Sequence, residues 1–158
     1  MPIYYLHLIK LAIFLLVLVI FVPRTEIRRL TVYGIVFGST YDVIGLTIGH
    51  LTNTFRWINF APFGYGHLPL DSPISWCSFY IIYFYLLPKH KPLIYIFPVS
   101  GIVMSMIYSR ALVNLGMFIE PNFLLRLANF TVWFSLATWG YLKLNAYVEA
   151  KHKNIHET

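Results

Sequence analysis

The sequence has little charge, a single cysteine and no motif of a known catalytic class. Charged residues make up 11% of the chain, against roughly 25% in soluble domains. One cysteine, Cys77, excludes an intrachain disulfide and a CxxC redox pair. The patterns GxSxG, GxGxxG, HExxH and the P-loop are absent from all 158 residues. We therefore expect neither a bound metal nor a cofactor.

Apolar stretches dominate instead, since 58% of the residues are hydrophobic. A soluble chain of this size could not bury so much apolar surface, so lipid must cover part of it. A transmembrane helix needs about 20 residues, and 17 still suffice. We predict an all-α integral membrane bundle with five transmembrane helices, at 3–22, 30–51, 72–87, 93–113 and 125–147. They form one domain over 1–149, followed by a disordered polar cytoplasmic tail at 150–158.

Basic residues alternate between the segments that join these spans. In a five-span protein, Arg56 and Arg126 fall on one side of the membrane and eight other basic residues on the opposite side. The eight are Arg24, Arg28, Arg29, Lys89, Lys91, Lys143, Lys151 and Lys153. The positive-inside rule then places the N-terminus outside and the C-terminus in the cytoplasm. Because these residues lie between apolar spans, we expect them to face lipid headgroups and expect no nucleic-acid partner.

Asp42 is the residue of the second span that costs most free energy to place in a membrane. An uncompensated Asp at the centre of a transmembrane helix costs about 2.5–3.5 kcal/mol. At 100° per residue, four glycines fall with Asp42 within an arc of roughly 80°. They are Gly34, Gly38, Gly45 and Gly49. Glycine stripes let another helix approach closely, so we expect Asp42 to face protein rather than lipid.

The fourth span offers partners for that face. Gly101, Ser105 and Ser109 recur every fourth residue, and Ser105 lies at about the depth of Asp42, where its hydroxyl could donate to the carboxyl. Arg110 lies slightly nearer the outer surface, and its side chain leans toward Asp42. It points roughly 100° away from Ser109, so one packing face cannot make both contacts. An Asp42–Arg110 ion pair and an outward-snorkelling Arg110 both stay open.

Further polar residues fall on the predicted outer side. His50 ends the second span and completes the candidate intramembrane site of Asp42, Ser105 and Arg110. A candidate outer pocket comprises Arg56, His67, Asp71 and Glu120. Most of these lie in the aromatic-rich connection at 52–71, and aromatic rings favour headgroup depth. We expect this connection to lie along the membrane interface.

The stretch from Gly38 to Trp76 carries a resemblance. Asp42 follows Gly38 in an early span, the loop FAPFGYGHLP covers 60–69, and Pro73-Ile74 and Trp76 open the next span. In these features the chain resembles a group of uncharacterised small multi-pass membrane proteins of spore-forming Firmicutes. The resemblance implies a membrane location and topology, and it carries no activity.

Two classes of function follow from these observations. The first is a non-enzymatic multi-pass protein of a bacterial cell membrane that binds a membrane-protein partner or a second copy of itself, or that organises the lipid bilayer. The alternative is a small membrane-embedded transporter or lipid-modifying enzyme that uses Asp42 and Arg110. In that version Asp42 exchanges a proton or binds substrate, and Arg110 holds an anionic headgroup or tunes the pKa of Asp42.

Overall fold

The chain is mostly helical. The computed structural model describes residues 2–120 and 122–156, with side chains through residue 148. The helices are α1 (Tyr4–Phe21), α2 (Arg24–Tyr33), η1 (Gly34–Thr40), α3 (Tyr41–Leu51), α4 (Asp71–Leu86), α5 (Lys91–Asn114) and α6 (Phe123–His156). Because α2, η1 and α3 follow one another without a break, they form one long segment whose middle, η1, is π-helical.

Prolines mark several helix ends. Pro23 separates α1 from α2, and Pro88 follows α4. Pro92 lies in the first turn of α5, where a missing N–H leaves no hydrogen bond unmade. Helix α6 runs on to His156, so it includes most of the tail predicted at 150–158, whose last two residues lie outside the described residues.

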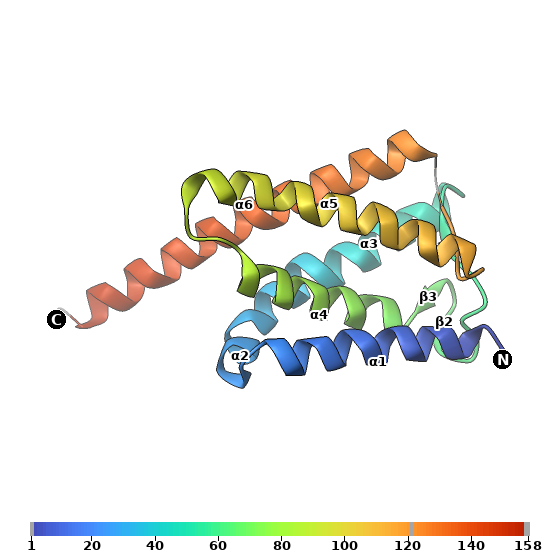
Figure 1. The fold of residues 1–158 in the computed structure, drawn as a ribbon, viewed down its shortest axis with the longest axis horizontal. Helices are drawn as coiled ribbons and strands as arrows, with labels where there is room; N and C mark the ends of the chain where they lie inside the picture. Colours follow the sequence, from blue (N-terminus) through green and yellow to red (C-terminus); the bar gives the residue numbers. More distant parts are fainter. Residues whose placement is uncertain (1, 121, 157–158) are drawn as a thin grey trace.

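The helices run side by side in an elongated bundle (Figure 1). Helix α4 packs against α1, α2 and η1, whereas α5 packs against α6. The connections α1–α2 and α4–α5 lie at the end of the bundle from which α6 projects toward the C-terminus. The N-terminus, the α3–α4 connection and the α5–α6 connection lie at the opposite end. We call this opposite end the N-terminal end.

Two very short strand pairs order the N-terminal end. Strand β1 (Arg56–Trp57) pairs antiparallel with β4 (Phe118–Ile119), so Trp57 lies opposite Phe118. Strand β2 (Gly64–Tyr65) pairs antiparallel with β3 (Leu68–Pro69) around Gly66, whose φ of +61° suits glycine. The prediction of helices alone missed these pairs. The β1–β4 pair fastens the α3–α4 connection to the α5–α6 connection, whereas the β2–β3 pair lies within the α3–α4 connection.

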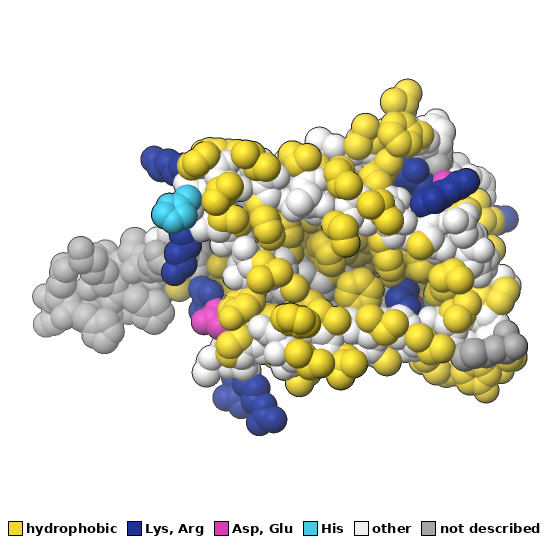
Figure 2. All heavy atoms as spheres, in the orientation of Figure 1, with side chains coloured by type: hydrophobic (Ala, Val, Ile, Leu, Met, Phe, Trp, Pro, Cys, Tyr) yellow, Lys and Arg dark blue, Asp and Glu magenta, His cyan; other side chains and the backbone are white. Residues whose placement is uncertain are grey.

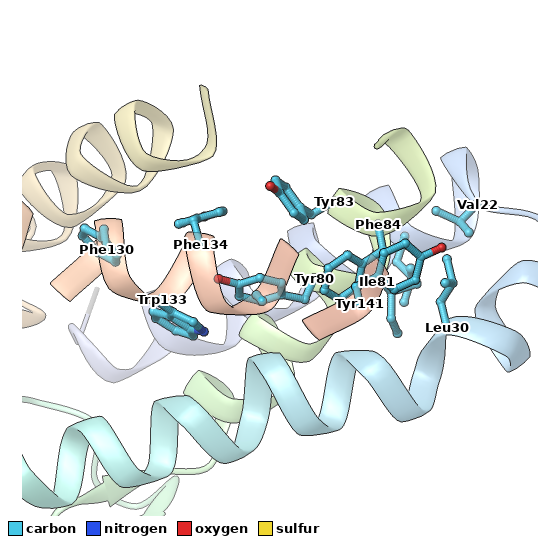
Figure 3. Packing of buried hydrophobic residues seen from close by; sticks show 12 residues of the cluster. Val22, Leu30, Tyr80, Ile81, Tyr83, Phe84, Phe130, Trp133, Phe134 and Tyr141 are labelled. Atoms are coloured by element: carbon cyan, nitrogen blue, oxygen red, sulfur yellow. The ribbon is translucent and has the colours of Figure 1, made fainter. Parts of the chain in front are cut away.

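Aromatic side chains fill the core between α4 and α6 (Figure 3). Tyr80 of α4 and Phe134 of α6 are fully buried, and their ring centroids lie 5.5 Å apart. Phe84 of α4 stacks on Tyr141 of α6 at 4.4 Å. Such pairs add about 0.5–1.5 kcal/mol each beyond burial. The bundle is thus held by large rings at this interface.

Large apolar side chains also cover the outside (Figure 2). On the face shown, Lys and Arg gather mainly toward the two ends of the molecule. Three helical segments are long and apolar enough to cross a membrane: Tyr4–Phe21, Arg24–Leu51 and Lys91–Asn114. Helix α4 has only 16 residues.

The glycine stripes face neighbours other than the expected ones. A Cβ on Gly38 would lie 2.5 Å from the Trp76 carbonyl oxygen, so η1 packs tightly on α4 and not on α5. Gly34 likewise contacts α4, Gly49 contacts Phe55, and Gly101 of α5 contacts Phe134 of α6. A Cβ on Gly45 would meet no atom within 4 Å, so this glycine packs against no helix. The expected pairing of the second span with the fourth is therefore wrong, because α4 covers Gly34 and Gly38 and a ring of α6 covers Gly101.

Candidate functional site

Four ionisable side chains are buried together toward the N-terminal end of the bundle. His7 and Lys10 come from α1, Asp42 from α3 and Asp71 from the start of α4. Their exposed fractions are 0%, 8%, 6% and 2%. We call this set the buried cluster. Charged groups rarely lie so deep without partners or a function.

Asp71 contacts both basic residues of the buried cluster. Nδ1 of His7 lies 3.2 Å from each Asp71 carboxylate oxygen, and Lys10 Nζ forms an ion pair with Oδ2. Nε2 of His7 lies 3.3 Å from the Ile58 carbonyl oxygen. Both ring nitrogens of His7 thus face oxygen acceptors.

Local sequence explains this arrangement. His7 and Lys10 are three residues apart, so they share one face of α1. Asp71 is the first residue of α4, where the helix dipole favours a carboxylate. Lys10 Nζ also lies 3.9 Å from the centroid of the Trp57 ring, a cation–π contact. The aromatic connection at 52–71 is therefore folded onto the charges of α1.

Asp42 has a different environment from Asp71. Its Oδ2 is buried and accepts no hydrogen bond from the residues that the structure describes. Ser72 is its polar neighbour, while Lys10 and Asp71 act on it only through space. Asp42 forms no ion pair within the described residues. One carboxylate of the cluster thus has two basic partners and the other has none.

The π-helical section η1 sets the position of Asp42. Ser39 Oγ donates to the Pro73 carbonyl oxygen at 2.8 Å, and Trp133 Nε1 donates to the Phe37 carbonyl oxygen at 2.6 Å. These contacts anchor η1 to α4 and to α6 immediately before Asp42. Single π-helical turns occur frequently at functional sites.

Two neighbouring cavities lead to Asp42. The large cavity, about 410 Å³, lies between α3 and α6 and is lined among others by Gly45, Ile48, Leu125 and Arg126. The inner chamber, about 70 Å³, is lined among others by Asp42, Trp57, Trp76, Tyr108 and Trp133. The two share five lining residues, which are Phe55, Ser109, Phe118, Asn129 and Phe130. They therefore adjoin, and the carboxyl of Asp42 lies at the inner one.

Arg110 does not pair with Asp42. Its Nη1 lies 3.0 Å from Oε1 of Glu120, which also forms an ion pair with Arg126. The short α5–α6 connection returns Glu120 to the last turns of α5, and this explains the pairing. Ser105 is buried, and its hydroxyl has no hydrogen-bond partner among the described residues. The polar neighbour of Asp42 is Ser72 instead. The structure therefore shows neither predicted contact of Asp42: Arg110 pairs with Glu120, and Ser72 takes the place of Ser105.

The candidate outer residues separate into several places. His67 stacks on His50, with ring centroids 4.5 Å apart, and its Nε2 lies 3.3 Å from the Thr47 hydroxyl. Asp71 belongs to the buried cluster, Glu120 lies with Arg110, and Arg56 is exposed on β1. In the part of the chain that the structure describes, no three His, Cys, Asp or Glu residues are placed to hold a metal ion. A single outer pocket does not form.

Sequence reasoning missed His7, Lys10 and Ser72 as neighbours of the acidic residues. The sequence could have indicated His7 and Lys10, because Lys10 is a basic residue within an apolar span and His7 shares its helix face. The burial of Asp71 could not be predicted from the sequence, since it depends on how the aromatic connection at 52–71 packs against α1.

Taken together, the buried cluster and the two cavities form a binding site more readily than a catalytic one. His7 has both nitrogens engaged, so neither is free to activate a hydroxyl or thiol. The cavities are mostly apolar and end at a carboxylate without a basic partner. Comparisons with protein-family models, with curated proteins and with solved structures gave no match.

Proposed function

We propose that the chain is a five-span protein of a bacterial cell membrane, with its N-terminus outside and its C-terminus in the cytoplasm. The arrangement of the connections supports this topology, because the basic α1–α2 and α4–α5 connections lie at the same end as the C-terminal part of α6 (Figure 1). The short helix α4 would cross with help from its covering neighbours, α1 and η1. The resemblance to membrane proteins of Firmicutes supports the bacterial location.

The topology can be tested by labelling single cysteines. Cys77 is replaced by Ser, and a cysteine is introduced at Tyr65, which is 87% exposed on β2. We expect a membrane-impermeant maleimide to label this position in intact cells and a cysteine at Arg28 only after lysis. The opposite pattern would reverse the proposed orientation.

The proposed role is non-enzymatic binding of an amphiphilic small molecule that enters from the lipid. One observation carries it: the large cavity of about 410 Å³ adjoins the chamber of Asp42. Ligand sites typically have 300–1,000 Å³, apolar walls and a few fixed polar groups. This cavity has that size and composition.

The walls of the large cavity support entry from the membrane. Ile44, Ile48 and Leu125 line it and are 54%, 55% and 44% exposed. In a bilayer these side chains would contact lipid, so an alkyl chain could pass between α3 and α6 without crossing water. Arg126 and Asn129 add polar groups to the same walls.

Filling the large cavity tests this role. Gly45 lines the large cavity and a Cβ on it would meet no atom within 4 Å, so Gly45→Phe is the substitution that directs a ring into this space. The probes are tritiated decanol, decanoate and decylammonium, added to protein in dodecyl maltoside micelles. We expect saturable binding of at least one probe, weakened at least about tenfold by Gly45→Phe.

The matched control is Val103→Phe, which adds a ring at a residue of α5 that is 51% exposed and lines neither cavity. It should leave binding unchanged. If no probe binds saturably, or if both variants weaken binding equally, the proposed role is wrong.

Transport is the second candidate, because Asp42 lies within electrostatic range of Lys10 and Asp71. A change of charge at Asp42 would therefore be felt by the rest of the buried cluster. Proteoliposomes that release the bound probe across the bilayer, and that lose this release with Asp42→Asn, would favour a transporter. The lipid-modifying enzyme that uses Arg110 has no such support, since Arg110 pairs with Glu120.

A further inference from the structure

The walls of the inner chamber are unusually rich in aromatic rings. The chain has four tryptophans, and three of them, Trp57, Trp76 and Trp133, line this chamber together with Tyr108. Trp76 and Trp133 lie against each other, with ring centroids 4.4 Å apart. The face of an aromatic ring is electronegative and attracts cations, most strongly for tryptophan.

A carboxylate faces this aromatic wall. Asp42 lines the chamber and is only 6% exposed. Its Oδ2 has no hydrogen-bond donor among the described residues. A buried carboxylate oxygen without a donor is costly. A cation that enters the chamber would relieve this cost.

The protein itself already holds an ammonium group on one of these rings. Lys10 Nζ lies 3.9 Å from the centroid of Trp57 and forms an ion pair with Asp71. One tryptophan and one carboxylate thus bind an ammonium inside the bundle. Trp76, Trp133 and Asp42 repeat the same pair of chemical groups, and no side chain of the described residues forms an ion pair with Asp42.

We propose that the inner chamber binds the ammonium group of an amphiphilic organic cation, with its alkyl chain in the large cavity. This inference rests on the proposed binding role and specifies its ligand. The chamber volume of about 70 Å³ suits a compact head such as an ammonium.

Other ligand classes fit less well. An anionic head would meet the Asp42 carboxylate, and a neutral head would leave its charge uncompensated. An inorganic divalent cation requires about six or more oxygen ligands. The chamber is lined mainly by rings, with Asp42 as its acidic residue.

The decisive experiment compares probes of equal chain length. Binding of tritiated decylammonium, decyltrimethylammonium, decanol and decanoate is measured in dodecyl maltoside micelles, which contain no ammonium. We expect the better of the two cations to bind at least about tenfold more tightly than decanol. Asp42→Asn, which keeps the shape of the side chain, should remove this preference of the cations over decanol.

A tryptophan pair provides a second measure that does not depend on Asp42. Trp76→Leu removes a ring of the chamber, whereas Trp139→Leu removes a ring that is 63% exposed and lines neither cavity. We expect only Trp76→Leu to weaken cation binding, by at least about threefold. Equal thermal unfolding midpoints of the two variants would exclude a loss of fold as the cause.

The outcomes separate the two proposals. If decanol binds as tightly as both cations and Asp42→Asn changes nothing, the ammonium site is wrong while the binding role survives. If no probe binds saturably to the wild-type protein, both proposals fail. Competition by phosphatidylethanolamine would identify the ammonium as that of a lipid headgroup, and cation binding without such competition would identify a free amphiphilic amine; either result supports the site.

Discussion

The two buried aspartates have nearly the same exposure and opposite surroundings. Asp71 is 2% exposed and contacts both His7 and Lys10, whereas Asp42 is 6% exposed and contacts no basic group directly. Burial alone therefore does not distinguish a structural carboxylate from a functional one. The difference lies in direct contact with a basic side chain: Asp71 has two such partners, and Asp42 has none among the described residues.

The contrast also separates two tasks within one cluster. The Asp71 ion pairs fasten α1 to the start of α4, and the paired charges satisfy each other. Asp42 has Ser72 as its polar neighbour and lines the inner chamber.

The largest effect is expected from Asp71→Asn. This change leaves Lys10 and His7 buried without a carboxylate, and removing one partner of a buried pair typically costs about 3–5 kcal/mol. Unfolding in maltoside micelles by added dodecyl sulfate measures the loss. Glu26→Gln is the control, because the Glu26–Arg29 pair is solvent-accessible and worth about 0–1 kcal/mol. Equal stability of the two variants would show that Asp71 has no structural role.

A second substitution should recover part of that loss. Lys10→Met removes one stranded cation from the Asp71→Asn background and keeps the length of the side chain. We expect a coupling energy of about 1–3 kcal/mol between the two positions in a double-mutant cycle. Strictly additive effects would mean that the Lys10–Asp71 pair contributes nothing to the fold.

Asp42→Asn should have little effect on stability, in contrast to Asp71→Asn. Because Asp42 has no direct basic partner, removing its charge leaves no cation stranded, and we expect a change within about 1 kcal/mol. Abundance in the membrane and the unfolding midpoint measure this directly. A loss as large as that of Asp71→Asn would assign Asp42 to helix packing and remove the basis for the binding site.

The sequence predicts the helices well because hydropathy and proline positions determine them locally. Five apolar stretches correspond to five helical segments, and α4 begins at Asp71 where 72 was predicted. Helix partners were less predictable. The Gly34/Gly38 face suits any close neighbour, and nothing in the sequence indicates that α4 rather than α5 occupies it.

The candidate site was predictable only in its central residue. Asp42 stands out because an acid in an apolar span is costly whatever surrounds it. Its neighbours depend on long-range folding: the connection at 52–71 brings Trp57 onto Lys10, and the β1–β4 pair fixes that connection. Two strands of two residues each are too short to be recognised from a sequence pattern.

The smallest effect is expected from Arg110→Leu. The side chain of Arg110 is 63% exposed, and Glu120 keeps its second partner, Arg126, so the change should alter stability by at most about 1 kcal/mol. The same substitution in the Asp42→Asn background should have the same effect as in the wild-type protein, because the two residues are not partners. A double-mutant cycle on unfolding measures this. A rescue of Asp42→Asn by Arg110→Leu would instead place Arg110 beside Asp42 in the membrane, and the buried carboxylate would then have its own cation and no need of a ligand.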